Sequence, residues 1–464
     1  MSRGRPRPDV EPPTSLTGIR AAQEANFQRM LDLCFAAHPH YRRLWGEQGL
    51  RRDEVRSLAD LPKLPLTRKE TYVADPEAFR LRVEALPALP PEERTLWEVV
   101  YTTGSTDQPA PFYGTTHDHY SRIFQLRRMA EIAGIRRDDV VVNLFPLTAV
   151  PHQGFLSALY GTLWVGARLV APFTGRPLGS FPLHRDTDHA VDLAAAHRAT
   201  ILWGISSYVR RVVQRAEALG ADLSSVRLCL VMGEGCPPGM REDIRRRLRW
   251  LGAGEVVINN GYGFTEMQGP APECCEGSGY HLPTPTEFAV EILDPESLAP
   301  QPDGCPGLVV LSHLNRRGTV LLRYLVGDCS ALTWAPCPHC GFAGPRFTMA
   351  PYRTGGLVKV KGTLVNLAAL HEALWGLPGL EEHQVALTKA DRADPFSADV
   401  LVVRAAVAEA PRAAVGSEIA RRARATCAVT VEVEFVPADY FAEPLQEYKF
   451  RRIVDERPAG GRLT

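Results

Sequence analysis

Hydrophobic positions in the middle of this chain recur with two periods, and together they predict strands and helices in alternation. Short apolar runs are typical of buried strands, and apolar residues three and four positions apart are typical of helices. This order is that of a layered α/β domain with a largely parallel sheet. The predicted strands are Asp139–Leu144, Thr200–Trp203 and Val226–Val231, and the predicted helices are Tyr208–Leu219 and Gly239–Leu251.

The two ends of the chain carry different patterns. Residues 19–50 have apolar positions at helical spacing, and Thr67–Glu70 looks like a helix start. From Tyr352 onward, short strand and helix patterns compose a small α+β domain. We therefore expect two domains, residues 1–352 and 353–464. The C-terminal elements are predicted at Leu357–Val360, Leu367–Leu374, Gln384–Leu387, Val400–Val403, Glu418–Ala425 and Val429–Phe435.

Composition narrows the class of protein. Lys+Arg and Asp+Glu number 53 each in 464 residues, so nothing favours a nucleic-acid or anionic-membrane partner. The longest apolar stretch, Phe155–Ala167, is too short to span a bilayer, and residues 1–18 lack the apolar core of a signal peptide. We expect a cytoplasmic protein with no membrane partner, whose ten cysteines are thiols or metal ligands.

A loop rich in hydroxyl groups and glycine follows a strand-like run near residue 100. Such a loop can offer backbone N–H groups and hydroxyls to a polyphosphate, although Ser/Thr/Gly clusters are more often solvated turns. The candidate phosphate-binding residues are Thr102, Thr103, Gly104, Ser105 and Thr106.

Three later segments support the interpretation of that loop as a phosphate-binding loop. They are Asn260–Glu266, Arg323–Asp328 and Tyr448-Lys449. In this order the four segments resemble the adenylate-forming superfamily of acyl-CoA synthetases, luciferases and peptide-synthetase adenylation domains. The resemblance is strongest to the phenylacetate–CoA ligase-like branch and covers nearly the whole chain. The further segments that carry it are His38–Arg43, Ser57–Glu70, Glu273-Cys274 and Gly279–His281.

The resemblance implies a large layered α/β N-terminal domain and a small, mobile α+β lid that carries the catalytic lysine. It also implies a two-step reaction with ATP, Mg²⁺ and coenzyme A. A carboxylic acid, expected to be small and aromatic, is first activated as an acyl-adenylate. The acyl group then passes to the thiol of coenzyme A as AMP leaves.

The same resemblance assigns residue roles. Tyr262 would stack on adenine beside Gly263, Thr265 would bind the α-phosphate, and Glu266 would ligate Mg²⁺. Asp328 would bind the ribose hydroxyls with Arg323 nearby, and Lys449 would stabilise the transition state. The wall of the adenine pocket is assigned to Gly233, Glu234 and Gly235, and the acid pocket to Phe145, His152 and Phe155.

The sequence departs from the family at two places. Asp107-Gln108 stands where the family has Gly-Lys, so a positive charge near the triphosphate is missing and a carboxylate is added. Gly355-Gly356 stands where the family has Asp or Lys at the hinge. Glycine keeps rotation available, although coupling between the two half-reactions can become looser.

Cys337-Pro338-His339-Cys340 supplies two thiols at a spacing typical of zinc sites. His281 and either Cys274 or Cys275 would complete a Cys₃His structural site, and Cys274 is preferred because it follows Glu273 as in the family. A dithiol redox motif and a pair of buried thiols are the alternatives. The redox motif would need a helix beginning at Cys337, whereas the residues that follow read as turns.

Two other functions stay open. An adenylate-forming enzyme could pass its acyl group to an amine or a carrier-protein thiol. A non-catalytic homologue could keep the fold without the reaction, with or without nucleotide binding. Many family members are dimers, so a homodimer is a further outcome that the resemblance leaves open.

Overall fold

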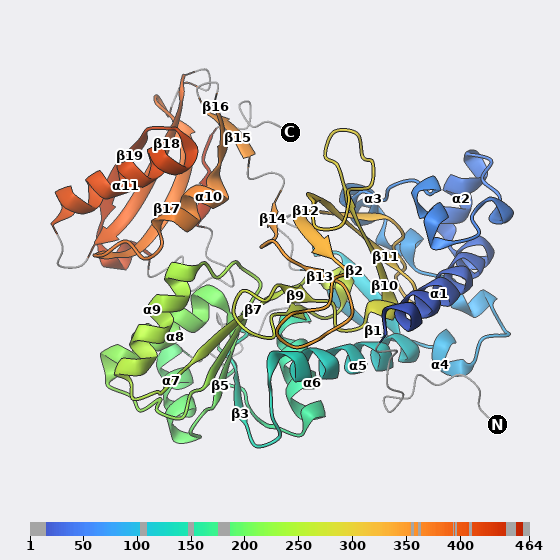
Figure 1. Ribbon diagram of the computed structural model, residues 1–464, viewed down its shortest axis with the longest axis horizontal. Helices are drawn as coiled ribbons and strands as arrows, with labels where there is room; N and C mark the ends of the chain where they lie inside the picture. Colours follow the sequence, from blue (N-terminus) through green and yellow to red (C-terminus); the bar gives the residue numbers. More distant parts are fainter. Residues whose placement is uncertain are drawn as a thin grey trace, which may run out of the picture.

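The computed structural model of the chain describes its helices, strands and most connecting loops (Figure 1). The described residues are 15–102, 109–146, 153–174, 186–353, 357–360, 363–392, 394, 397–407, 411–441 and 452–457.

A sheet in the strand order β4-β3-β5-β6-β7-β8 forms the centre of the larger part of the molecule. Neighbouring strands run parallel from β4 to β7, and β8 pairs antiparallel with β7. The predicted layered domain with a largely parallel sheet is confirmed. The strands are β3 (Val140–Asn143), β4 (Arg168–Val170), β5 (Ile201–Ile205), β6 (Leu228–Met232), β7 (Val257–Tyr262) and β8 (Ala271–Pro272).

Helices cover both faces of this sheet, because alternate strand residues point to opposite sides. Ile201, Trp203 and Ile205 pack in one core with α5 and α6, whereas Leu202 packs in the other core with α7, α8 and α9. Strands buried on both faces read as continuous apolar runs, as β5 and β6 do. The helices are α5 (Thr116–Ala133), α6 (Gln153–Val165), α7 (Thr187–Ala196), α8 (Ser206–Leu219) and α9 (Pro238–Trp250).

A second, largely antiparallel sheet in the order β10-β11-β12-β13-β9 lies beside the first, with β14 paired to β12. Its core also takes in side chains of the N-terminal helices, such as Phe27 and Trp45. A hairpin-like pair, β1 and β2, leads into α5. These strands are β1 (Leu96–Tyr101), β2 (Pro111–Thr115), β9 (Tyr280–His281), β10 (Phe288–Leu293), β11 (Pro306–His313), β12 (Tyr324–Thr333), β13 (Arg346–Phe347) and β14 (Tyr352–Arg353).

The helical pattern over residues 19–50 is divided between two helices. Helix α1 ends at Ala37, and His38 caps α2 by accepting a hydrogen bond from the Tyr41 amide. Pro39 occupies the first position of α2, where its missing N–H group costs no hydrogen bond. The helices of this region are α1 (Leu16–Ala37), α2 (Pro39–Glu47), α3 (Lys69–Ala74) and α4 (Pro91–Arg94), with 3₁₀ turns η1 (Arg52–Glu54), η2 (Leu58–Lys63), η3 (Pro76–Phe79) and η4 (Val83–Ala85).

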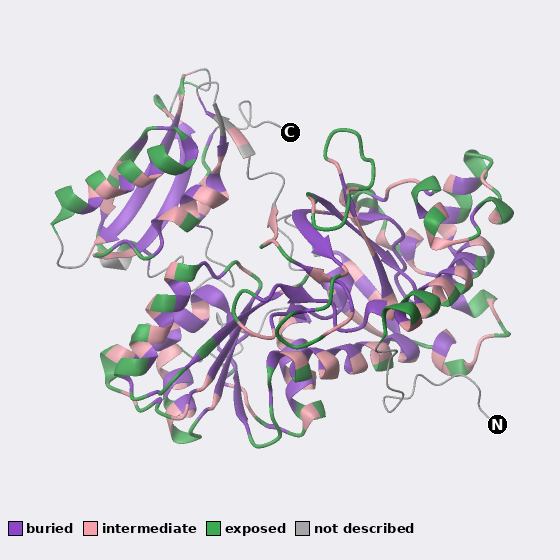
Figure 2. Ribbon diagram, in the orientation of Figure 1, coloured by how far each residue is buried: buried purple, intermediate pink, exposed green. Residues whose placement is uncertain are grey.

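The C-terminal unit, residues 357–457 where described, has a separate core under α10 and α11 (Figure 2). Its sheet has the order β19-β18-β17-β20, and β15 pairs with β16. The predicted α+β character is confirmed, and α10 has the predicted bounds. The elements are β15 (Leu357–Val360), β16 (Thr363–Asn366), α10 (Leu367–Leu374), β17 (Leu380–Lys389), β18 (Asp399–Val407), α11 (Arg412–Cys427), β19 (Val431–Val436), η8 (Ala438–Phe441) and β20 (Ile453–Asp455).

No helix in the described part of the chain combines the length and apolarity that crossing a bilayer requires.

Candidate nucleotide and metal sites

Two of the predicted nucleotide-binding residues meet at the end of β7. The Tyr262 hydroxyl donates a 2.8 Å hydrogen bond to Oδ2 of Asp328, which lies on β12 of the second sheet. Asp328 is buried and Tyr262 is half-buried. An aromatic face next to a buried carboxylate suits a nucleoside, which offers a flat base and ribose hydroxyls.

Glu266 lies in the 3₁₀ turn η5 (Thr265–Met267) that follows β7, and its side chain is held in one orientation. The Tyr324 hydroxyl donates to its Oε1 at 2.7 Å, and His313 Nε2 donates to its backbone carbonyl at 2.8 Å. His313 Nδ1 accepts from the Leu321 amide, which fixes the tautomer. Burial lowers the pKa of His313 to about 3, so its ring is neutral.

Side-chain amides from two helices secure the turn around Glu266. Gln125 of α5 donates to the carbonyls of Met267 and Gly269, at 3.1 and 3.2 Å. Gln153 of α6 donates to the carbonyl of Gln268 at 2.7 Å. The turn that contains Thr265 and Glu266 is therefore anchored to the helix layer on one face of the central sheet.

The predicted wall of the adenine pocket follows β6, the neighbour of β7. Gly233 adopts a φ of +84°, a conformation that favours glycine, and Ser206 at the start of α8 donates to the Glu234 carbonyl. The carboxyl ends of adjacent parallel strands meet at one edge, where open α/β sheets bind ligands. The segment after β6 and the segment after β7 therefore share the position expected of a nucleotide site.

Arg323 binds a carboxylate and two backbone carbonyls through its guanidinium. Its Nε and Nη2 atoms each donate to Glu291 at 3.1 Å, and Nη1 donates to the carbonyls of Pro62 and Leu64. It immediately precedes β12 and has a φ of +47°. These contacts tie the N-terminal loop to the second sheet.

The predicted phosphate loop and acid pocket are described in part. Thr102 Oγ1 accepts a hydrogen bond from the Ala110 amide across the base of the loop. Phe145 is buried in the core of α5 and α6, and the Phe155 ring lies 6.0 Å from that of Phe173. The other residues assigned here lie outside the described residues: Thr103, Gly104, Ser105, Thr106, Asp107, Gln108, His152, Gly355, Gly356 and Lys449.

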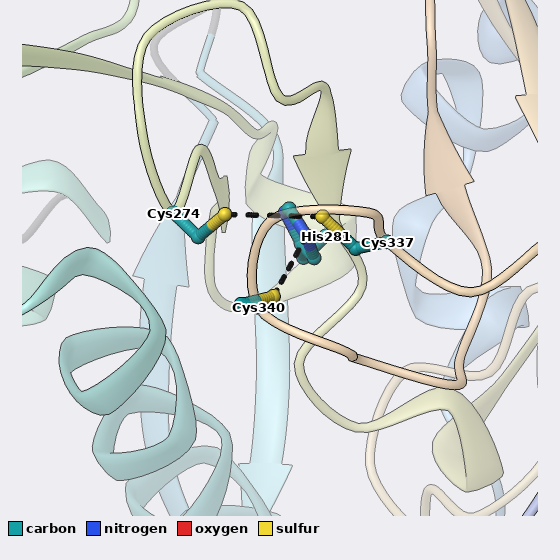
Figure 3. Close-up of side chains that lie close together, drawn as sticks. All are labelled: Cys274, His281, Cys337 and Cys340. Carbon is teal, nitrogen blue, oxygen red and sulfur yellow. Dashed lines mark hydrogen bonds between the residues drawn. The ribbon is translucent and has the colours of Figure 1, made fainter.

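Cys274, His281, Cys337 and Cys340 come together into one cluster (Figure 3), with their ligand atoms all within 4.8 Å of one another. The sulfur atoms of Cys274 and Cys337 are 3.9 Å apart, and Cys340 Sγ is 3.4 Å from His281 Nε2. The structure thus places Cys274, rather than Cys275, in the group.

His281 is oriented for coordination. Its Nδ1 lies 3.1 Å from the Pro272 carbonyl, an acceptor that requires the proton on Nδ1 and leaves a lone pair on Nε2. Burial lowers the pKa of the ring, which favours the neutral form.

A dithiol redox motif would require a helix that begins at Cys337. The described residues from Cys337 to β13 form turns and bends, with no helix starting at Cys337. Nothing there supplies the helix N-terminus that would activate a thiol.

Two groups of supporting residues were missed by the sequence analysis. One is the pair Tyr324 and His313, which fixes Glu266. The other is Arg241, whose guanidinium donates to Glu273 at 2.8 Å while Glu273 also accepts from the amides of Asn260 and Gly277. For the first group, the signal in the sequence was Tyr324, which stands among apolar residues in the Arg323–Asp328 segment. The hydroxyl of a buried tyrosine usually has a hydrogen-bond partner.

The fold and the candidate nucleotide site agree with a family of nucleotide-using enzymes that the sequence matches. A family model described as "AMP-binding enzyme" matches residues 43–317, more than half of the chain, and the chain belongs to that family.

Relatives with known names match along nearly the whole length. A phenylacetate-coenzyme A ligase of Thermus thermophilus is 26% identical, over 95% of this chain and 97% of that protein. The Escherichia coli protein of the same name is 24% identical, over 96% of each chain. The predicted resemblance to the phenylacetate–CoA ligase-like branch is confirmed.

Solved structures share the fold. A 2-hydroxyisobutyryl-CoA ligase in its postadenylation state is 22% identical and superposes with a TM-score of 0.79, covering 97% of this chain and 95% of that one. The anthranilate CoA ligase AuaEII gives a TM-score of 0.51 at 17% identity, covering 74% of this chain and 63% of that one.

Proposed function

We propose that this chain is an AMP-forming acid–CoA ligase that activates a small carboxylic acid, with an aromatic acid as the expected class. The observation that carries the proposal is the hydrogen bond between Tyr262 and Asp328. It joins Tyr262, at the carboxyl end of β7, to Asp328 on β12 of the second sheet, two residues with predicted nucleotide-binding roles in a chain of the AMP-binding enzyme family.

In the first step a carboxylate oxygen of the acid attacks the α-phosphorus of ATP. The bond between the α-phosphorus and the bridging oxygen breaks, and pyrophosphate leaves. In the second step the thiol sulfur of coenzyme A attacks the acyl carbon, AMP leaves with the bonding electron pair, and the thiol proton is lost. The products are an acyl-CoA thioester, AMP and pyrophosphate.

The chain supplies binding and orientation for the nucleotide. Tyr262 presents its ring to adenine, and Asp328, whose Oδ2 accepts from the Tyr262 hydroxyl, binds the ribose hydroxyls. Gly233–Gly235 forms the opposite wall, and Thr265 binds the α-phosphate. The Glu266 carboxylate would hold Mg²⁺, which neutralises charge on the phosphate oxygens when bound.

The remaining roles rest on the resemblance. Thr102–Thr106 holds the β- and γ-phosphates, and Lys449 stabilises charge that develops on the α-phosphate. Phe145, His152 and Phe155 line the acid pocket. Residues 353–464 form the mobile lid, with Gly355 and Gly356 at its hinge. Cytoplasmic location and homodimer formation stay predictions of the sequence.

The Cys₃His cluster fits a structural zinc ion. Tetrahedral zinc, with Zn–S about 2.3 Å and Zn–N about 2.0 Å, separates two sulfurs by about 3.8 Å and a sulfur from a nitrogen by about 3.5 Å. The corresponding distances in the cluster are 3.9 and 3.4 Å. The Pro272 carbonyl on His281 Nδ1 is the type of outer contact that orients a histidine ligand.

Product analysis with three acceptors tests the proposed function. The protein is incubated with MgATP and a panel of aryl and short aliphatic acids, and then with coenzyme A, an amine or a carrier-protein thiol. We expect an acyl-CoA product and AMP. An acyl-amide or an acyl-carrier product would assign the second half-reaction to another acceptor, and no ATP binding at all would favour a non-catalytic homologue.

Replacement of Asp328 by asparagine is expected to raise the KM for ATP about thirtyfold. The substitution removes charge-assisted hydrogen bonds to the ribose, which are worth about 1.5–3 kcal/mol. The KM for the acid should change little because the proposed role of Asp328 is to bind the ribose and not the acid. Steady-state kinetics with each substrate varied measure both constants, and equal increases in the two would contradict the assigned role.

Tyr262→Phe is the matched control for that variant. It keeps the aromatic face and removes only the hydroxyl that touches Asp328, so the KM for ATP should rise less than tenfold. Tyr262→Ala, which removes the ring, should have the larger effect.

A further inference from the structure

The C-terminal unit touches the larger part of the molecule at helices α8 and α9 (Figure 1), and one contact there is unusually close. A Cβ added to Gly239, near the start of α9, would lie 2.7 Å from both the backbone carbon of Trp375 and the backbone nitrogen of Gly376. Trp375 is buried in the core that α8 and α9 form with the central sheet. Gly239 therefore permits a backbone approach that no other residue would allow without movement.

Around Trp375, a buried carboxylate is shared by two arginines. Glu382 on β17 accepts from Arg452 Nε and Nη2, at 3.1 and 3.0 Å, and from Arg210 Nη1 at 3.4 Å. Arg210 belongs to α8 and also donates to Asp243 of α9 at 2.7 Å. The ion pairs thus run from α9 through α8 into the C-terminal sheet.

Arg452 also reaches the predicted wall of the adenine pocket. Its Nη1 lies 3.6 Å from Oε2 of Glu234, in the segment that follows β6. The guanidinium carbons of Arg452 and Arg210 lie 5.4 and 5.0 Å from the Trp375 ring centroid, within cation–π range. Arg452 therefore contacts both sides of the interface at once.

The indole of Trp375 is itself fixed. Its Nε1 donates to His371 at 3.1 Å, and His371 lies 2.8 Å from His383. Burial lowers the pKa of both imidazoles, that of His383 to about 4, so neither adds a third positive charge beside the arginines. Arg452 therefore meets two carboxylates, those of Glu234 and Glu382, and shares the second with Arg210.

Arg452 is three residues from Lys449 in the sequence. Three peptide units span at most about 11 Å between Cα atoms. The residue to which the resemblance assigns catalysis is therefore a near neighbour in the sequence of the arginine that contacts Glu234 and Glu382.

We propose that Arg452 is a positioning residue for adenylate formation, and that with Glu234, Glu382, Arg210 and Trp375 it forms a clamp that holds the C-terminal unit against the nucleotide site. The assignment of adenylation to this arrangement rests on the proposed function. In this arrangement Glu234 has a second role besides lining the adenine pocket, because its carboxylate contacts Arg452 of the C-terminal unit. Because the clamp need not persist while the acyl group is transferred, its loss should affect the two half-reactions unequally.

Two variants weaken the clamp by unrelated means. Arg452→Gln removes the charge, while Arg210 remains to pair with Glu382. Gly239→Ala removes no charge and raises the intrinsic helix propensity of α9, but it blocks the backbone approach to Trp375. Arg421→Gln is the matched control, because Arg421 lies exposed on α11 of the same unit and pairs only locally with Glu418.

The two half-reactions are measured separately in single turnover: pyrophosphate release without acceptor, and thioester formation from supplied acyl-adenylate and coenzyme A. We expect both clamp variants to slow the first about tenfold to a hundredfold, as a misplaced catalytic group does. The KM for ATP and the rate of thioester formation should stay within about threefold of the wild-type values. A threefold change corresponds to less than about 1 kcal/mol. Arg452→Lys should recover part of the loss, and Arg421→Gln should behave as wild type. Equal losses in both half-reactions would overturn the proposal.

The distance between the C-terminal unit and the larger part of the molecule tests the clamp independently of activity. Spin labels are attached through ketone-bearing residues at the exposed positions Glu255 and Ala425, because native thiols would also react with cysteine reagents. We expect a single narrow distance distribution in the wild type and a broader, longer one in both clamp variants. Unchanged distributions would contradict the clamp. If the wild type released no pyrophosphate with any acid, the proposed function would fail, and the distances would still show whether Arg452 holds the unit in place.

Discussion

Replacing Glu266 by glutamine is expected to lower the rate of acid-dependent pyrophosphate release at least about a hundredfold, or about 2.7 kcal/mol of transition-state stabilisation. The carboxylate is buried, and the Tyr324 hydroxyl and the turn after β7 hold it in place. Glutamine has the same shape and can still accept that hydrogen bond, so the fold should be kept. What it lacks is the negative charge that a magnesium ion on the phosphates requires. The rate is measured with saturating MgATP and acid, and thermal unfolding checks the fold.

Tyr324→Phe provides the control for this prediction. It removes the hydroxyl that orients Glu266 and leaves the carboxylate, so the loss should stay within about tenfold, the value of one hydrogen bond. Raising the magnesium concentration should recover activity in the phenylalanine variant more than in the glutamine variant. A Glu266→Gln enzyme with wild-type activity would remove Glu266 from the metal site.

Replacing Cys337 by serine is expected to abolish zinc binding and to lower the melting temperature by at least about 5 °C. A structural zinc site stabilises the folded state directly, and the melting temperature of a domain of this size moves by about 1–2 °C per kcal/mol. The effect should be large because the cluster joins the loop after β8, strand β9 and the loop before β13. Elemental analysis should find about one zinc per wild-type chain, and a chelator should lower the wild-type melting temperature toward that of the variant.

Cys275→Ser is the matched control because Cys275 is adjacent to Cys274 and lies outside the cluster. It should retain zinc and nearly all of the wild-type stability. Wild-type protein that contains no zinc after growth with the metal, or a Cys337→Ser protein that retains it, would end the zinc assignment.

The repetitive parts of the fold could be predicted because local pattern and tertiary position agree. Strand β6 is apolar on both faces and is buried on both faces, and α10 has the same bounds in the sequence analysis and in the structure. The break between α1 and α2 was missed, although Pro39 marks it. Helical spacing continues across the break, since a proline in the first turn of a new helix leaves the apolar period intact.

The residues of the candidate sites also fall into two groups, those that could be predicted from the sequence and those that could not. The Cys/His cluster could be predicted because the spacing of Cys337 and Cys340 is typical of zinc ligands, while the choice of Cys274 over Cys275 came from the family resemblance. The partners of Glu266 and the contacts of Arg452 could not, because they depend on which segments the topology brings together. Arg323 illustrates the same dependence: the sequence could not indicate that its guanidinium donates to Glu291 and to the carbonyls of Pro62 and Leu64.

Exchange of labelled pyrophosphate into ATP tests whether this protein forms an acyl-adenylate, because the exchange reports reversible formation of that intermediate without any acceptor. We expect exchange that requires both Mg²⁺ and a carboxylic acid, is strongest with small aromatic acids, and is lost in Glu266→Gln. Exchange that proceeds without an acid, or its absence across the whole panel in protein that binds MgATP, would contradict this prediction.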